Sequence, residues 1–206
     1  MEYMDAVLGN GAFYIIVLVF SFLHECVHAF AAARAGGGGR MGLRGLFGNV
    51  LYLEPGLSPG RRAAVYAAGP LFNVFCAAAG TAAALLVRAG GRSYDAPAPF
   101  QALFETFMPY AYNGLVMIVY ANLMLAAFNM LPFYPLDGGR ITLLILSASL
   151  GTRTAVKIAC VFSILFSVSV FFLGLYLVQY NIMNVILAVD AFYFLYIFER
   201  EINEIF

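Results

Sequence analysis

The chain has 206 residues, of which 63% are hydrophobic and 11% are charged. Soluble domains carry about 45–50% apolar and about 25% charged residues, so this composition excludes an ordinary soluble globular protein. The formal net charge is zero and no stretch forms a basic patch, so nucleic acid is not expected as a partner.

The first apolar segment, residues 12–34, is long enough to cross a bilayer as a helix. The ten residues before it contain Glu2 and Asp5 but no lysine or arginine, which is unlike the start of a signal peptide. We therefore expect this segment to be a mature membrane span. The glycine run at residues 36–39 should end it, because glycine is unfavourable inside a helix.

Four more segments have the length and apolar character of spans. Ser58 and Pro59 are typical of a helix start and precede the second span, and Pro132 should end the third. The predicted spans after the first are residues 63–87, 112–131, 154–177 and 182–198.

Three connections are unlike solvated loops. Residues 49–53 predict a short β-strand that dips toward the membrane, where irregular backbone must be buried in protein or line a cavity. Residues 94–109 combine prolines with phenylalanines and predict a short interfacial helix. Residues 132–140 break the helical pattern, and a short helix at the membrane face is expected over 138–150.

These segments predict an all-α polytopic membrane protein with about five transmembrane helices and a short membrane-dipping β segment after the first. We expect one membrane-embedded domain over residues 1–206, with a catalytic core at about 12–150 and additional helices at 154–199. Cytoplasmic loops are rich in lysine and arginine, so the N-terminus is placed outside and the C-terminus in the cytoplasm. The cytoplasmic basic residues are then Arg34, Arg40, Arg44, Arg61, Arg62, Arg140, Arg153, Lys157 and Arg200, against Arg88 and Arg92 outside.

The two histidines of the chain both lie in one run of the first span, His24-Glu25-Cys26-Val27-His28. Residues four apart project from the same helix face, about 6 Å from each other. This is the HExxH pattern of zinc peptidases, in which both histidines bind the metal and the glutamate is the general base. Ionisable groups are costly inside a membrane and usually functional there, so the run predicts zinc chemistry within the bilayer.

A catalytic zinc site normally has a third protein ligand. Glu54, Asp137 and, with less support, Asp190 are the carboxylates at suitable depth. Prolines precede Asp137 and glycines follow it, so the helix breaks there and the carboxylate can turn inward. Asp137 could alternatively serve only as the N-cap of the next helix.

Three motifs in this order resemble those of the site-2 protease family of intramembrane zinc proteases. They are HExxH at 24–28, the run Ala68-Gly69-Pro70-Leu71-Phe72-Asn73, and the residues Asn129, Pro132, Pro135, Leu136, Asp137, Gly138, Gly139 and Arg140. The resemblance covers residues 20–140 and is greatest to the bacterial sporulation branch, which processes a membrane-tethered sigma-factor precursor. That branch usually has a further span before HExxH and commonly a nucleotide-sensing domain, and neither is found in these 206 residues.

The resemblance implies a role for each matching residue. His24, His28 and Asp137 would bind one Zn²⁺ per chain, and Glu25 would take a proton from the attacking water and deliver it to the departing amine. The implied substrate-binding residues are Asn73, Asn129 and Pro135. The implied activity is hydrolysis of a peptide bond in or next to a membrane segment of a protein such as a membrane-tethered transcription-factor precursor, with the active site opening to the cytoplasm.

Other readings of the same residues stay open. A metal transporter could use the same histidines and aspartate without needing Glu25 as a base. Asn73 and Asn129 could instead form interhelical hydrogen bonds in lipid. Regulation by a separate inhibitory membrane partner is a hypothesis that rests on how little of the chain lies outside the membrane. The role of Asp190 is left open.

Overall fold

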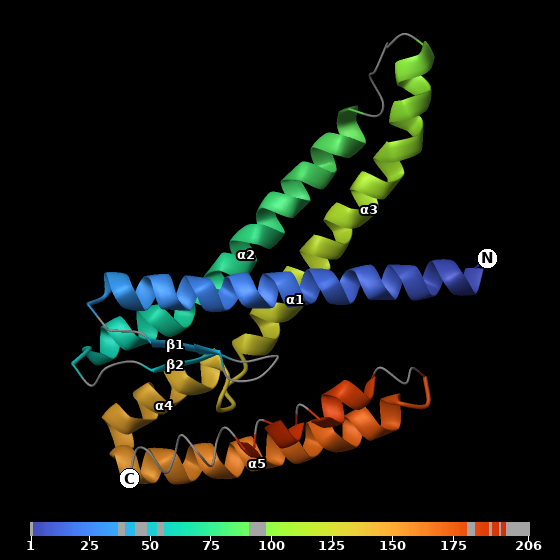
Figure 1. The fold of residues 1–206 in the computed structure, drawn as a ribbon. Helices are drawn as coiled ribbons and strands as arrows, with labels where there is room; N and C mark the ends of the chain where they lie inside the picture. Colours follow the sequence, from blue (N-terminus) through green and yellow to red (C-terminus); the bar gives the residue numbers. More distant parts are fainter. Residues whose placement is uncertain are drawn as a thin grey trace. The chain divides into compact units, whose positions relative to one another are not determined.

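The computed structural model describes residues 2–36, 40–43, 49–52, 56–90, 98–180, 184–189, 191–193 and 195–196 (Figure 1). The helices and strands are α1 (Glu2–Arg34), β1 (Arg40–Leu43), β2 (Asn49–Tyr52), α2 (Pro59–Gly90), α3 (Ala98–Asn129), α4 (Asp137–Leu150) and α5 (Thr152–Leu177). Apart from the two short strands, the described residues are almost entirely helical.

Four of these helices are long and apolar enough to cross a membrane, as the sequence predicted for its first four spans. The spanning segments are Gly11–Arg34, Pro59–Ala89, Glu105–Asn129 and Thr152–Leu177. The predicted fifth span, 182–198, is only partly described, with helical residues at 185–189, 191–193 and 195–196. The total number of spans therefore stays a prediction, and Glu54 and Asp190 lie outside the described residues.

Helix α1 begins at Glu2, ten residues before the predicted span, and ends where the glycine run starts. Gly36 has a φ of 87°, a left-handed conformation that glycine adopts without steric cost. Large apolar side chains such as Ile15, Phe22 and Phe30 are exposed along α1. Large apolar side chains exposed along a helix of this length suit a lipid environment.

Strands β1 and β2 form an antiparallel hairpin, and β2 contacts α1. Arg40 pairs with Tyr52 at one end of the ladder and Leu43 pairs with Asn49 at the other. The sequence predicted a strand at 49–53 but no pairing partner for it. The predicted position of this strand at the membrane is not tested by the fold.

Helix α2 begins at Pro59, as the Ser58-Pro59 pair predicted, and the Arg62 N–H donates to the Ser58 carbonyl at 3.0 Å. It packs closely on α3 at Gly80, where an added Cβ would lie 3.0 Å from the Val119 side chain. Small residues permit such close approach of membrane helices.

The prediction of a separate interfacial helix at 94–109 is wrong for its described part. Helix α3 runs without a break from Ala98 through Pro109 to Asn129. Proline removes one backbone hydrogen bond, and membrane helices tolerate this loss because neighbouring groups satisfy the freed carbonyl.

The chain divides into two compact units. The first contains α1, the hairpin, α2 from Ala68 onward and α3 to Phe128; the second contains the start of α2 and the chain from Asn129 onward. In the second unit α4 packs against α5 after a turn at Gly151, which has a φ of 80°. The face of α5 that is buried in this unit consists of Ala155, Val156, Ser163, Ser167, Val170 and Gly174.

Candidate metal centre

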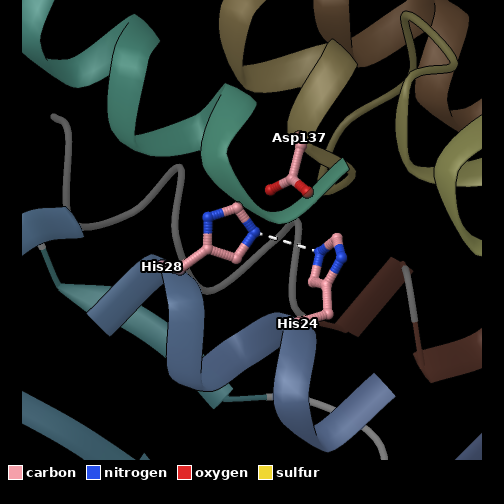
Figure 2. A group of neighbouring side chains, drawn as sticks. All are labelled: His24, His28 and Asp137. Atoms are coloured by element: carbon pink, nitrogen blue, oxygen red, sulfur yellow. Dashed lines mark hydrogen bonds between the residues drawn. The ribbon is translucent and has the colours of Figure 1, made fainter. Parts of the chain in front are cut away.

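The three predicted zinc ligands form one group in the structure. His24 and His28 project from the same face of α1 and are each only 3% exposed. Asp137 is the first residue of α4. One ligand atom from each of the three side chains lies within 4.8 Å of the others (Figure 2). This group is the only cluster of three or more candidate metal ligands among the residues that the structure describes.

The two imidazoles face each other through their Nε2 atoms, which are 3.0 Å apart (Figure 2). Ligands of tetrahedral zinc lie about 2.0–2.1 Å from the metal, which places two nitrogen ligands about 3.3 Å from each other. The observed separation is close to that value. Two histidines and one carboxylate also match a common catalytic zinc set, in which the fourth position is left for water or substrate. The donor atoms therefore fit zinc.

Asn73, the last residue of the 68–73 motif on α2, contacts the first histidine. Its Oδ1 lies 2.9 Å from His24 Nδ1, and the asparagine is fully buried. An amide oxygen can only accept, so the hydrogen lies on Nδ1. With the hydrogen on Nδ1, the Nε2 atom of His24 can present its lone pair to the point between the two rings, where it faces His28 Nε2.

The close approach of α2 to these imidazoles requires a glycine at position 69. A Cβ added there would lie 2.6 Å from His24 Nε2 and closer still to His28 Nε2. Carbon and nitrogen atoms that are not bonded approach to about 3.5 Å. The glycine backbone therefore occupies the side of both rings on which the metal-binding nitrogens lie.

The turn that carries Asp137 is fixed within the second unit. The Tyr134 N–H donates to Ser163 Oγ on α5 at 3.0 Å, and Arg140 Nε–H donates to the Pro135 carbonyl at 3.0 Å. The Arg140 guanidinium also lies over two aromatic rings, 5.6 Å from the centre of Tyr66 and 5.3 Å from that of Tyr134. These contacts define the start of α4 and so the position of its first carboxylate.

The structure gives the position and the burial of the other three predicted site residues. Glu25 is half-buried on α1 between the two histidines. Asn129 is the last residue of α3 and is half-buried, and Pro135 is half-buried and follows a cis peptide bond. Leu136, not Asp137, is the N-cap residue of α4. Capping alone therefore does not explain Asp137.

Comparison with known proteins adds two similarities. Residues 105–175, which include the Asp137 turn, match the family model of Peptidase family M50. The structure is similar to that of the Site-2 Protease from Methanocaldococcus jannaschii, with a TM-score of 0.54 and 24% sequence identity over 92% of this chain and 77% of that chain. The similarity shows a shared fold. No curated protein matches the sequence.

Sequence reasoning missed several residues that shape this centre. Gly69 belonged to a recognised motif, but nothing in the sequence showed that it faces both histidines. Ser163 and Ser167 are buried on α5 and four residues apart. Polar residues at helical spacing in an apolar span were the signal that could have identified this face. The stacking of Arg140 on Tyr66 joins residues far apart in the sequence, so no local pattern predicts it.

Proposed function

We propose that this protein is an intramembrane zinc metalloprotease. The observation that carries the proposal is the grouping of His24, His28 and Asp137 around one point, with Glu25 between the histidines on α1. The similarity of residues 105–175 to Peptidase family M50 and the fold shared with a site-2 protease support it independently. The four long apolar helices support a multi-pass location in a membrane.

The site residues would have different roles in peptide hydrolysis. His24, His28 and Asp137 would hold zinc, which supplies a Lewis acid and lowers the pKa of water to about 7. Glu25 would accept a proton from the attacking water and donate it to the departing amine. Burial of the histidines limits access of bulk water, so these charge interactions are stronger than they would be in solvent.

The finer features of the proposal rest on the sequence. The substrate would be a membrane-associated protein, such as a membrane-tethered transcription-factor precursor, and Asn129 and Pro135 would contact its extended backbone. The distribution of lysine and arginine supports an N-terminus outside, a C-terminus in the cytoplasm and a site open to the cytoplasm. A sporulation substrate is proposed on the resemblance alone, and an inhibitory membrane partner is proposed because little of the chain lies outside the predicted membrane spans. The metal-transporter alternative finds no support in the comparisons.

Two measurements on protein purified in detergent test the proposal. Elemental analysis of wild type should find one zinc per chain, and Asp137→Ala should lose most of it. Glu25→Gln should retain zinc, because it removes the base and no ligand. Wild type without zinc, or zinc that is indifferent to Asp137→Ala, would contradict the proposed site.

Cleavage is then measured in phosphatidylethanolamine and phosphatidylglycerol vesicles with a panel of fluorescent single-span peptides whose helices carry central glycine or asparagine. Wild type should cleave at least one peptide, and Glu25→Gln should cleave none, since positioned general acid–base catalysis contributes about 10²–10⁴-fold. Glu105→Gln is the matched control, because Glu105 is an exposed glutamate on α3. Cleavage by Glu25→Gln at the wild-type rate would refute the assignment.

A further inference from the structure

The contact between Asn73 and His24 bears on whether the Nε2 atom of His24 is available to bind a metal. Its Oδ1 accepts a hydrogen bond from His24 Nδ1, with 2.9 Å between the two atoms. We propose that Asn73 is a positioning residue, which holds His24 in the tautomer whose Nε2 lone pair faces the metal. This inference rests on the proposed zinc site and assigns a residue outside the set of ligands and base.

The opposite orientation of the Asn73 amide shows why the contact matters. With Nδ2 in place of Oδ1, the asparagine would present a donor to His24 Nδ1, which would then have to accept. The hydrogen of neutral His24 would move to Nε2 and block the lone pair that the metal needs. Metal-binding histidines generally donate their second ring N–H to an acceptor, which fixes both the tautomer and the ring orientation. Asn73 provides that acceptor here.

Burial gives a second reason to assign this role to Asn73. The side chain is fully buried, and its Nδ2 has no hydrogen-bond partner among the described residues. A buried donor without a hydrogen-bond partner destabilises a protein. A leucine of similar volume in this apolar span would avoid that penalty, so stability alone does not account for an asparagine at this position. The acceptor that it offers to His24 does.

The chain contains a matched control for this residue. Asn122 on α3 is also fully buried and also has one amide atom, Oδ1, without a partner among the described residues. Its Nδ2 donates to the Ile118 carbonyl of its own helix at 2.9 Å. Replacing Asn122 removes a buried amide of the same kind but no contact with a histidine.

The first test compares zinc affinities by competition with a chromogenic chelator. Asn73→Leu should bind zinc about 10–100-fold more weakly than wild type, the usual effect of losing a partner of a metal ligand. Asn73→Asp keeps an acceptor oxygen and should restore wild-type or tighter binding. Asn122→Leu should leave the affinity unchanged. Equal affinity of Asn73→Leu and wild type would overturn the positioning role while leaving the zinc site intact.

The second test reads the tautomer directly, and its deciding measurement is made on wild type. The chain has only two histidines, so ¹⁵N-histidine labelling gives two imidazoles to assign. In metal-free wild type, one imidazole should show a protonated Nδ1 and an unprotonated Nε2, and that signature should disappear in Asn73→Leu. A protonated Nε2 on His24 in wild type would overturn the inference. Wild type that binds no zinc would contradict the proposed function, and this inference with it.

Discussion

Replacing Gly69 with alanine tests whether α2 lies against the two imidazoles. The new methyl group would be 2.6 Å from His24 Nε2 and closer to His28 Nε2. Contact at about 3.5 Å requires the His24 ring to withdraw by about 0.9 Å. Zinc sites tolerate deviations of about 0.2 Å in their ligand distances, so the displacement is several times too large.

Gly69→Ala should weaken zinc binding more than the replacement of a residue that only contacts a zinc ligand. Removing such a neighbour weakens metal binding by about 10–100-fold. Gly69→Ala moves two ligands themselves, so we expect a loss of more than about 100-fold, or about 2.7 kcal/mol. The effect on helix stability has the opposite sign, since alanine inside a helix is favoured over glycine by about 0.5–1 kcal/mol. Zinc loss should therefore occur without loss of helical structure.

The assay combines elemental analysis with circular dichroism in the same detergent. Gly114→Ala is the control, because Gly114 lies inside α3 and a Cβ there would meet nothing within 4 Å. It should bind zinc like wild type. Gly69→Ala with full zinc and wild-type affinity would refute the reasoning, since the backbone of α2 could then not lie where it is described.

Two further predictions concern the turn before Asp137. Ser163→Ala removes the acceptor for the buried Tyr134 N–H and should lower the free energy of unfolding by about 1–3 kcal/mol in a detergent titration, whereas the exposed Ser149→Ala should change it little. Arg140→Met keeps the apolar stem but loses a charge-assisted hydrogen bond to the turn and stacking on Tyr134, so zinc affinity should fall about 10-fold by chelator competition. Arg153→Met, at an exposed position on α5, should leave the affinity unchanged; an equal loss in both variants would contradict a specific role for Arg140.

The first four apolar helices and the grouping of His24, His28 and Asp137 could be predicted because each depends on a strong local pattern. A run of about twenty apolar residues is typical of a membrane-spanning helix. The HExxH pattern places two imidazoles on one face of a helix in any surroundings. Asp137 could be predicted because prolines and glycines mark the helix break around it. The continuity of α3 through Pro109 could not, since proline breaks most helices and its tolerance depends on the surroundings.

The contacts of Asn73 and Gly69 could not be predicted from the sequence, for a different reason. Both residues belong to a recognised motif, but their partners lie on another helix, more than forty positions earlier in the chain. The resemblance implied substrate binding for Asn73, a role that stays a prediction. The atom that an asparagine contacts depends on how two packed helices are rotated about their axes and shifted along them. In apolar spans the sequence specifies this rotation and shift only weakly, because most faces of the helix are apolar.

The hydrogen bond between His24 and His28 bears on how such a protein is made. In a zinc finger the ligands have no partners without the metal, and the domain stays unfolded until zinc arrives. Here the two imidazoles satisfy each other across 3.0 Å, and Asn73 satisfies the outer nitrogen of one of them. The protein itself therefore provides hydrogen-bond partners for these buried imidazoles, so packing of the helices does not depend on a metal ion to satisfy them. To bind a cation through both Nε2 atoms, an imidazole that carries its hydrogen on Nε2 would move it to Nδ1, and the pair would lose no proton.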